Sequence, residues 1–530
     1  MVRHGELDSV KKGRWSAFNL NSWPSDLPLG HGGEWQGWSM PPRTDSEEWP
    51  EEQRHVVKRV LEAQYRKAGL TPPDQLSLLD QRDCRAVVAG HQLVVGGGAA
   101  FFHHKILSAI RVSRQLTQSM GKPVVPVFWM ASEDHDWQEI STLHGTEREH
   151  TWTPKGIDHP VPVGQLSLDG MQDVLLTWAE DGVVSEVSDG MLEDLTKARE
   201  NGETLSGAMR RWLHRWYGEC GLLVLDPDDA ALKALAPHLW SAEFEGAGIH
   251  SVLAGVAPQK GDAHVRENSV FWLDEKAGRI GVVRDIDGGG WRAGDKVLNR
   301  TGEDWSSWCA EHAKQCSPGV LLRPLYQETL LHSLAVVVGP GEWKYWNQIQ
   351  SAFVHHNIPF PPLRLRDHGV VISEEAVRLG WSLETGWLHD EAWDRWVLDR
   401  WVEALGEAVP QYESRLLDWH DAVEQWSKED MGGTLDGPSG ALRAATTKAW
   451  NQWKAKLRKS LKGTRSQEWT AARRACASLV RGGKPQDRWA NWHVLAGEHH
   501  ERWRQEWLEE ECGLAAQVWC FSPDQEGTNR

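Results

Sequence analysis

Two apolar runs that flank a helical stretch decide the fold of this chain: Arg85-Ala-Val-Val-Ala-Gly90 and Pro123-Val-Val-Pro-Val-Phe-Trp-Met130. Each run predicts a buried strand. Between them, a Gly-rich turn that ends at Gly98 leads into a predicted helix over residues 99–120, which Gly121 ends. A strand, a helix and a strand in this order form a βαβ unit, whose two strands lie parallel. The sequence therefore predicts an α/β fold built on a parallel sheet.

Further core segments are expected on the C-terminal side of this unit. A predicted helix over residues 205–217 leads to an apolar strand at 221–226, and residues 269–283 predict a β-hairpin. Two more apolar segments, at 320–325 and 334–338, are expected in the core. Strands interspersed with helices in this way extend the parallel sheet.

The character of the sequence changes after residue 381, where long helices are predicted. The stretch 388–430 carries many acidic residues, and the stretch 441–463 is basic. A Gly/Pro-rich turn at 431–440 separates them, so we predict an antiparallel helix pair with complementary charged flanks. The alternative is that the basic helix binds an anion or a polyanion.

These patterns predict five regions along the chain. They are a lead-in packed on the core (1–84), the first half of the core (85–145), insertions that include core elements at 205–230 and the hairpin at 269–283 (146–317), the second half of the core (318–382), and a helical region (383–530). Residues 146–200 are polar and are expected to be largely loops.

The composition excludes several classes of protein. The 530-residue chain has a formal net charge of −17, which opposes binding to nucleic acid or to an anionic membrane surface. The first 14 residues are polar and charged, without an export signal, and no apolar stretch is long enough to span a membrane. The seven cysteines are scattered, which is typical of a reducing compartment. We therefore expect a cytoplasmic protein.

The 33 tryptophans are unusually many for a chain of this length. Several lie at helical spacing, as do Trp393, Trp396 and Trp401, or Trp419 and Trp426. This spacing indicates that tryptophan replaces leucine and phenylalanine as core filler. An aromatic platform for a substrate is the alternative.

The first candidate site follows the first predicted strand. Gly90, His91 and Gln92 lead through the Gly-rich turn to Gly98, and Lys105 lies in the first turns of the helix that follows. Small residues and a helix N-terminus favour an anion, and a lysine nearby can pair with it. The pattern is neither a P-loop nor a dinucleotide fingerprint, so it predicts an anion site only weakly; a purely structural turn is the alternative.

The second candidate site follows the next strand and consists of Glu133, Asp134, His135 and Asp136. A histidine titrates near neutrality, and a neighbouring carboxylate can orient its ring, so this segment suits a general base. A magnesium site is a competing interpretation, because the ion prefers carboxylate oxygens. Charged residues exposed to solvent are the third alternative. The sequence does not distinguish among these.

A third candidate site lies in the second half of the core. Arg323 and Gln327 belong to the segment Arg323-Pro-Leu-Tyr-Gln-Glu328, and Gly339, Gly341 and Glu342 form a second Gly-rich turn after an apolar strand. Arginine can bind a carboxylate through two hydrogen bonds. A structural arginine that caps a turn is an equally good interpretation of Arg323.

Taken together, these three segments resemble the bacillithiol biosynthesis cysteine-adding enzyme family. The resemblance rests on Val87-Val-Ala-Gly-His-Gln92 with Lys105, on Pro126 to Asp136, on Leu322 to Glu328, on Val338 to Glu342 with Tyr345, and on Pro361 to Arg366. It covers roughly residues 85–375. The family usually has Thr-Gly-Gln-Gln at 89–92 and a tyrosine-containing run at 101–104, where this chain has Ala-Gly-His-Gln and Phe-Phe-His-His. The C-terminal part matches loosely, with Gln486-Asp-Arg488 as a remnant.

The resemblance implies a Rossmann-like core with insertions and a helical coiled-coil region that supports a homodimer. It implies a ligase that joins the carboxyl of cysteine to the amine of glucosaminyl malate, the last step of bacillithiol biosynthesis. Arg323, Arg364 and Arg366 are then candidates to bind the malyl carboxylates. We also expect the first Gly-rich loop and the Glu133–Asp136 segment to face one cleft, with Lys105 holding the anionic group of the activated carboxyl.

A free carboxylate does not condense with an amine in water without activation, so ATP with Mg²⁺ is the expected cofactor; no protein-bound metal is expected. Two other functions stay open from the sequence. One is a nucleotidyl- or acyl-transferase, or another amide ligase, that uses the same core with a different amine acceptor. The other is a helical scaffold without activity.

Overall fold

The computed structural model describes residues 15–19, 48–259, 261–285, 290–300, 304–379, 390–406, 408–510, 514 and 516–521. The start of the chain, on which the expectation about an export signal rests, and Cys512 lie outside these residues. The chain divides into two units: the first contains Met1–Val370 with Asp487–Phe521, and the second contains Val371–Gln486. The sequence analysis placed all of 383–530 in one helical region, whereas the structure assigns its last part to the first unit. None of the described helices combines the length and apolarity needed to cross a membrane.

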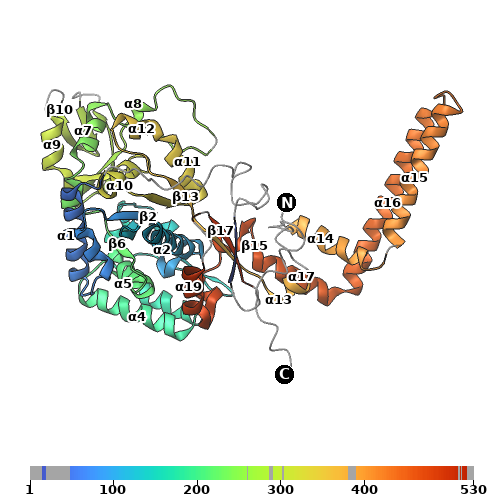
Figure 1. Ribbon diagram of the computed structural model, residues 1–530, viewed down its shortest axis with the longest axis horizontal. Coiled ribbons are helices and arrows are strands. Elements are labelled where there is room, and N and C mark those ends of the chain that lie inside the picture. Colours follow the sequence, from blue (N-terminus) through green and yellow to red (C-terminus); the bar gives the residue numbers. More distant parts are fainter. Residues whose placement is uncertain are drawn as a thin grey trace. The chain divides into compact units, whose positions relative to one another are not determined.

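A five-stranded sheet forms the centre of the first unit, with the strand order β13-β12-β2-β3-β6 (Figure 1). The strands are β2 (Arg85–His91), β3 (Val124–Met130), β6 (Leu223–Leu225), β12 (Ala335–Val338) and β13 (Leu363–Leu365). All neighbours in this sheet pair in parallel. The predicted α/β fold with a parallel sheet is therefore confirmed.

The order of these strands defines where a ligand site is expected. The chain starts at β2 and moves outward through β3 and β6, then returns to the other side of β2 with β12 and β13. The direction reverses between β2 and β12. In open α/β sheets the crevice at the carboxyl ends of two such strands is the usual place for a ligand.

The helix α2 (Phe101–Met120) crosses between β2 and β3, as predicted, and ends at Gly121, whose φ of 64° is the left-handed conformation that favours glycine. Its apolar face packs on the sheet, where it contributes Ala109, Val112 and Leu116 to a fully buried cluster with Val87 and other strand residues. This burial fixes the position of the turn that precedes the helix.

The helix α5 (Leu205–Tyr217) also forms where the sequence predicts it, and the lead-in region contains the helix α1 (Glu51–Lys67). The stretch 146–200 is less irregular than expected, because it contains α3 (Met171–Ala179) and α4 (Ser185–Glu200). Both helices are amphipathic and bury only a narrow apolar face, which includes Leu175 and Trp178 in α3. Their polar faces dominate the composition, which explains the expectation of loops.

A second, antiparallel sheet of the first unit has the order β10-β9-β8-β7-β11. Its strands are β7 (Val270–Asp274), β8 (Gly278–Asp285), β9 (Gly290–Ala293), β10 (Lys296–Arg300) and β11 (Cys316–Pro318). The strands β7 and β8 form the predicted hairpin, with Asp274 paired to Gly278.

The predicted core segment at 320–325 is mostly buried, with Leu321, Leu322 and Leu325 in the core, and it is not a strand. The helix α10 (Arg323–Leu331) begins within it, with a proline in its first turn. A short apolar run occurs in buried helices as well as in strands, and its length alone does not distinguish them.

The chain returns to the first unit at Asp487 after the second unit. This return contains α18 (Trp492–Ala496), α19 (His500–Glu509) and β17 (Gln517–Phe521). The strand β17 lies between β1 (Trp15–Asn19) and β14 (His368–Val371) in a three-stranded sheet. The helix α19 packs against α2. The last part of the sequence is thus built into the sheet unit.

The second unit is helical, as predicted, with α13 (Glu374–Arg378), α14 (Asp390–Glu403), α15 (Ala408–Glu429), α16 (Asp436–Thr464) and α17 (Ser466–Leu479) (Figure 1). The long helices α15 and α16 lie side by side.

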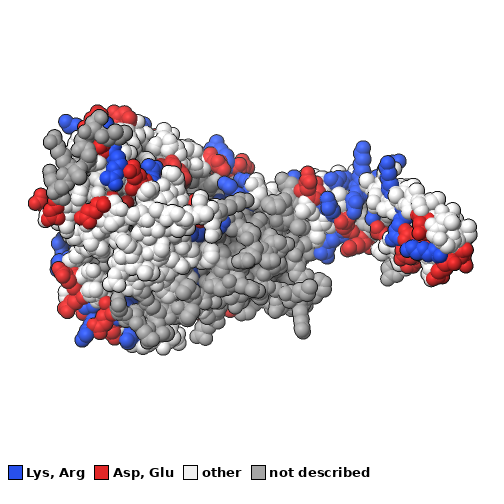
Figure 2. Space-filling view, turned by 90° about the horizontal axis from the view of Figure 1, so that it is seen from above, with Lys and Arg blue, Asp and Glu red and all other residues white. Residues whose placement is uncertain are grey.

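The predicted charge complementarity of the acidic and basic helices is present. Arg443 of α16 contacts Asp421 and Glu424 of α15, and Lys454 of α16 contacts Glu413 of α15. The later residue of α16, Lys454, pairs with the earlier residue of α15, Glu413, so the two helices are antiparallel. Figure 2 shows acidic and basic side chains interspersed on this part of the chain.

Candidate active site

A cavity of about 570 Å³ opens at the carboxyl ends of β2 and β12, where the strand order reverses. This volume is typical of small-molecule sites. Most of the residues predicted from the sequence line it. They are Gly90, His91, Gln92, Lys105, Glu133, Asp134, His135, Arg323, Gly339, Gly341, Glu342 and Arg366. Gly98, Asp136, Gln327 and Arg364 do not line this cavity.

Gln92 connects the first two predicted segments. Its side-chain amide donates hydrogen bonds to Asp134 Oδ2 and to Glu139 Oε2, each at 2.8 Å. Both segments follow neighbouring parallel strands, and Gly90 pairs with Trp129 across them. The first strand end and the acidic segment therefore face one cavity.

Lys105 lies at the bottom of the cavity, but its charge is already balanced. Its ammonium donates to the carbonyl oxygen of Gly90 and forms an ion pair with Glu342. Burial lowers the pKa of Lys105 below its ordinary value, while Glu342 opposes this change. Glu342 also accepts a hydrogen bond from the backbone N–H of Gly339 at 2.8 Å. Lys105 is thus half of a buried ion pair, and its predicted role of holding the anionic group of the activated carboxyl stays a prediction.

The Gly-rich turn itself is a structural element. Gly96, Gly97 and Gly98 are buried, and the side-chain amide of Asn491 donates to the carbonyl oxygens of Gly96 and Gly98 at 2.9 and 2.7 Å. At Gly97, with φ at 76°, a Cβ atom would lie 2.2 Å from Nε2 of His103. The glycines serve this tight packing, so the predicted anion cradle at Gly98 is not present.

His135 is held by an arginine from the second sheet. Arg279 Nη1 lies 3.0 Å from His135 Nδ1, and the guanidinium stacks 3.9 Å from the centre of the Phe271 ring. Arginine has only donors, so Nδ1 accepts this bond and a neutral ring carries its proton on Nε2. Burial and the charge of Arg279 lower the pKa of His135. The ring is therefore a hydrogen-bond donor at Nε2, which does not suit the predicted role of general base.

Glu133 is the carboxylate of this segment whose environment suits a base. It is 6% exposed, and its Oε1 lies 2.6 Å from the ammonium of Lys233, which also contacts Asp228 at 2.6 Å. Burial raises the pKa of Glu133 to about 7, although Lys233 lowers it. A carboxyl group with a pKa near neutrality can both take and release a proton at physiological pH.

The third predicted segment contributes Arg323, whose guanidinium donates to Gln327 Oε1 at 2.8 Å and to the hydroxyl of Tyr345 at 3.0 Å. A Cβ atom on Gly90 would lie 3.3 Å from Arg323, so glycine there allows the arginine to approach the strand end. Gln327 is fully buried behind Arg323 and supports it.

Arg364 has a structural role in the described chain. It donates to the carbonyl oxygen of Leu514 and to Asp367 Oδ1, both at 2.7 Å, and it is 6% exposed. Asp367 also contacts Arg111 of α2 at 2.8 Å. Arg364 therefore fastens β13 to the returning chain and is directed away from the cavity.

Four cationic or histidine side chains of the cavity wall were not predicted as site residues. They are His264, Arg266, Arg279 and Arg488. The first three come from the segment before β7 and from β8, within the region treated as an insertion. Arg488 comes from the returning chain, and its only signal in the sequence was the short Gln486-Asp-Arg488 remnant. None of the four lies at a strand end of the central sheet, where the sequence analysis searched for function.

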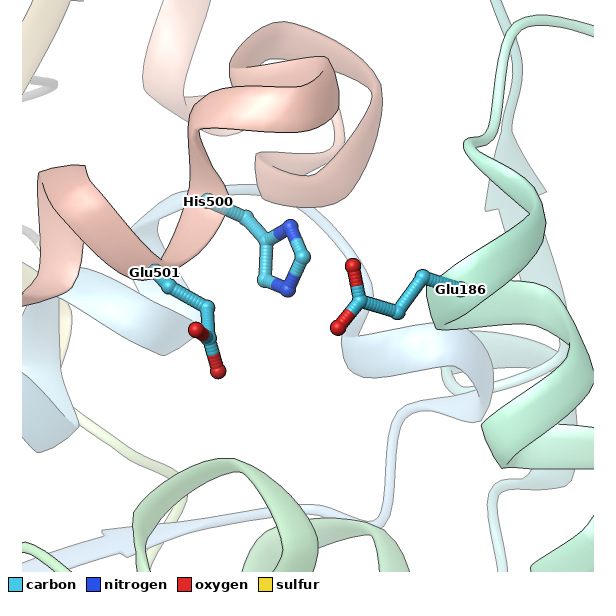
Figure 3. A group of neighbouring side chains, drawn as sticks. All are labelled: Glu186, His500 and Glu501. Atoms are coloured by element: carbon cyan, nitrogen blue, oxygen red, sulfur yellow. The ribbon is translucent and has the colours of Figure 1, made fainter.

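A separate group outside the cavity resembles a metal site (Figure 3). Glu186, His500 and Glu501 each offer one ligand atom, and these atoms lie within 4.8 Å of one another. Both glutamates occupy the first turn of a helix, where the helix dipole favours them, and Glu501 also lies 3.6 Å from Arg504. These contacts explain the cluster without an ion, so we assign it no function.

The sequence matches those of known proteins. A family model described as "Bacillithiol biosynthesis BshC, N-terminal Rossmann-like domain" matches residues 40–367, more than half of the chain. Two proteins named "Putative cysteine ligase BshC" are each 30% identical: that of Salinibacter ruber over 328 residues, 59% of either chain, and that of Cytophaga hutchinsonii over 351 residues, 62% of this chain and 61% of its own. The match thus spans about three-fifths of the length of these relatives.

A relative of the same name from Geobacillus thermodenitrificans is 26% identical over 482 residues, which is 83% of this chain and 85% of its own length. This match extends beyond the central sheet into the helical part of the sequence. The family model covers β2, β3, β12 and β13, whose carboxyl ends surround the cavity. The chain belongs to the BshC family of bacillithiol biosynthesis, and its central sheet is the Rossmann-like domain of that family.

Proposed function

We propose that this protein is a cytoplasmic ligase that joins the carboxyl group of cysteine to the amine of glucosaminyl malate, in the last step of bacillithiol biosynthesis. The observation that carries the proposal is the cavity at the reversal of strand order, because segments matched by the family model supply most of its wall. The names of the relatives support a cysteine ligase. Gln92, Lys105 and His135 all lie on the one cavity wall, which argues against a scaffold without a site.

The charges of the cavity suit these substrates. The malyl group carries two carboxylates, and Arg266, Arg279, Arg323, Arg366 and Arg488 place guanidinium groups on the wall. Carboxylates bind such groups through paired hydrogen bonds. The acids Glu133, Asp134 and Glu139 line the same cavity and can hold the amino groups of cysteine and of the acceptor.

We assign the proton transfer to Glu133. The acceptor amine forms the amide bond as the activating group leaves the cysteine carbonyl carbon with its bonding electron pair. The amine must lose a proton in this step, and Glu133 has a pKa of about 7 on the cavity wall. The Nε2–H of His135 then serves as a donor to the oxyanion that develops on the attacked carbonyl group. Arg279 holds the ring in the orientation that this role requires.

Activation of the cysteine carboxyl by ATP with Mg²⁺ belongs to the proposal as an expectation only. The buried Gly96–Gly98 turn does not offer the cradle for phosphates that the sequence suggested. The N-terminus of α11 (Pro340–Gln348) is capped by its own Glu342. Omission of ATP, or chelation of Mg²⁺, should abolish product formation if the expectation is right.

We also propose that the protein is a homodimer through the helical unit. Tyr412, Trp419 and Trp426 of α15 are spaced by seven residues, and their exposed fractions are 59%, 44% and 49%. Residues at this spacing form one stripe along a helix. Half-exposed aromatic side chains in a stripe are typical of a protein interface, and a second copy supplies a matching stripe.

The experiment that tests the function uses the purified full chain with cysteine, glucosaminyl malate and Mg-ATP. Mass spectrometry should detect the amide product and its free thiol. If the protein is instead a transferase or ligase with a different amine acceptor, a product should form only when another amine replaces glucosaminyl malate. Low-molecular-weight thiols measured in cells with and without the gene test the same assignment in vivo, and unchanged bacillithiol would contradict it.

A further inference from the structure

The chain re-enters the first unit at Asp487, and its first residues complete the cavity. Arg488 lines the cavity directly, and Asp487 lies behind Arg366 on the same wall. Two residues further on, the backbone carbonyl of Ala490 accepts from the N–H of Ala100 at 2.7 Å, ahead of α2, and Asn491 binds the Gly-rich turn. This return segment, Asp487 to Asn491, is therefore fastened to the site over its whole length.

Asp487 positions Arg366. Its Oδ2 accepts from Arg366 Nη1 at 2.7 Å and lies 3.1 Å from His368 Nδ1, and both members of the Arg366–Asp487 pair are 2% exposed. Burial lowers the pKa of His368 to about 4, so this histidine is neutral at physiological pH. Asp487 is thus the counter-ion of Arg366, whose guanidinium lies 5.1 Å from the centre of the Phe101 ring at the cavity wall.

Arg488 is different, because its guanidinium forms no hydrogen bond or ion pair with the described residues. It is partly buried, and both burial and the charge of neighbouring Arg366 lower its pKa, although Asp487 opposes this change. A partly desolvated cation next to another cation is unfavourable unless an anion joins them. The arrangement therefore suits an anionic ligand at this end of the cavity.

The other charges at this end limit the kind of anion. Lys105 is paired with Glu342 and Arg366 with Asp487, whereas Arg488 has no hydrogen-bonded carboxylate partner among the described residues. A single carboxylate matches one positive charge, whereas a nucleotide triphosphate carries several negative charges. The α11 N-terminus, where a phosphate would be stabilised, already holds the carboxylate of Glu342.

We propose that Arg488 binds one carboxylate of the malyl group of the acceptor, and that Asp487 is a positioning residue that keeps Arg366 beside it. The planar guanidinium can bind a carboxylate through two parallel hydrogen bonds, which a lysine cannot reproduce. This assignment rests on the proposed function and makes the return segment the part of the site that selects an acidic acceptor.

The experiment compares the wild type with Arg488→Ala and Arg488→Lys, and uses Arg59→Ala as a matched control, because Arg59 is an exposed arginine of α1 away from the cavity. We expect Arg488→Ala to raise the KM for glucosaminyl malate about 10- to 100-fold, with kcat within about threefold of the wild type, because a charged hydrogen-bond pair is lost. Arg488→Lys should recover only part of this loss. The KM values for cysteine and ATP should not change.

A second acceptor substrate shows whether Arg488 acts by binding the malyl group or by supporting the structure of the site. Glucosamine lacks the malyl group, so wild type and Arg488→Ala should use it equally well, both poorly. A KM increase for cysteine or ATP in place of glucosaminyl malate would overturn the assignment, as would an equal loss with glucosamine. Asp487→Asn, which retains a hydrogen-bonding group, should raise the KM for glucosaminyl malate less than Arg488→Ala.

Calorimetry with L-malate alone distinguishes failure of this inference from failure of the proposed function. If the wild type binds L-malate and Arg488→Ala binds it at least tenfold more weakly, the carboxylate site stands even when no amide product forms. If both proteins bind L-malate equally, or neither binds it, Arg488 is not a carboxylate site, whatever the catalytic activity. Inorganic phosphate serves as the competing probe, and tighter binding of phosphate than of L-malate at Arg488 would contradict the assignment.

Discussion

The two units of this chain use the same kinds of side chain in opposite surroundings. In the sheet unit, the Arg366–Asp487 pair is 2% exposed on either side, whereas Lys454 and Glu413 of the helical unit are 19% and 42% exposed at 2.5 Å separation. Tryptophan differs in the same way, since Trp129 is 1% exposed and Trp426 is 49% exposed. Burial, and not residue type, therefore assigns these groups to a site or to a surface.

This contrast has a physical basis. A buried ion pair is hard to break, because removal of one member leaves the other charge desolvated and unpaired. An exposed pair is screened by water and salt and contributes little to stability. The sheet unit can therefore hold charged groups at fixed positions around a cavity, while the helical unit exposes charges and aromatic rings to solvent.

The largest effect is expected from a substitution of Glu133, because its proposed role as a base depends on its burial. Glu133→Gln should lower kcat by about 10²–10⁴, as for the loss of a general base. The ionised form is the base, so wild-type activity should rise with pH through about 7, the raised pKa of Glu133, and the variant should lose this rise. The measurement is kcat against pH with both substrates saturating.

His135→Ala provides the matched comparison for that experiment. It removes a proposed oxyanion donor and should also lower kcat, but the rise with pH through about 7 should persist. Loss of the rise in His135→Ala, together with less than a threefold effect of Glu133→Gln, would return the role of base to His135, as the sequence first suggested.

The second prediction concerns stability. Asp487→Ala leaves Arg366 buried without its counter-ion and should lower the free energy of unfolding of the sheet unit by about 3–5 kcal/mol. Burial raises the pKa of Asp487, but Arg366 and the two neighbouring histidines lower it further, so its folded value lies well below the ordinary 3.8. The stabilisation is therefore present above pH 3.8 and is lost as the pH falls below it. Urea unfolding of both proteins at pH 7 and at lower pH measures the difference, and an unchanged midpoint at pH 7 would refute the prediction.

The third prediction tests the exposed aromatic stripe. Trp419→Asp combined with Trp426→Asp should weaken self-association at least about 100-fold, because buried aromatic residues dominate interface energies. Sedimentation at several concentrations measures the dissociation constant. Val283→Asp, which alters an exposed apolar residue of β8 in the other unit, is the control and should leave association unchanged. A wild type that is monomeric at all concentrations would rule out the dimer.

The smallest effect is expected at the exposed ion pair. Lys454→Ala should change the free energy of unfolding of the helical unit by only about 0.2–1 kcal/mol, and less in high salt. Thermal unfolding at low and high ionic strength measures it. A loss as large as that of Asp487→Ala would show that the helical unit also depends on buried charge.

Much of the fold follows from local patterns. The runs that became β2 and β3, the helix between them and the hairpin of β7 and β8 are short-range features, and their apolar periodicity and turn residues identify them. The segment at 320–325 became the start of a helix, because a short apolar run does not by itself distinguish a strand from a buried helix. The return of residues 487–521 to the sheet unit depends on contacts with residues hundreds of positions earlier, so no local pattern could show it.

The candidate site divides in the same way. Gly90, Glu133 and Gly339 each follow a predicted strand, so the sequence placed them at one edge of the sheet, where parallel strands bring their carboxyl ends together. The state of each side chain was not predictable, because it depends on partners from other elements. Glu342 neutralises Lys105, Arg279 occupies Nδ1 of His135, and Asn491 binds the Gly-rich turn.

The α/β class, the family and the edge of the sheet at which the polar residues gather were all predictable from the sequence alone. These properties depend on periodicity, turn chemistry and short motifs, which are local. The balance of charges, the carboxylate with a pKa near neutrality and the place of Arg488 on the cavity wall all depend on the tertiary structure. Electrostatic interactions depend on distance and burial in space, and neither quantity is encoded at any single position of the chain.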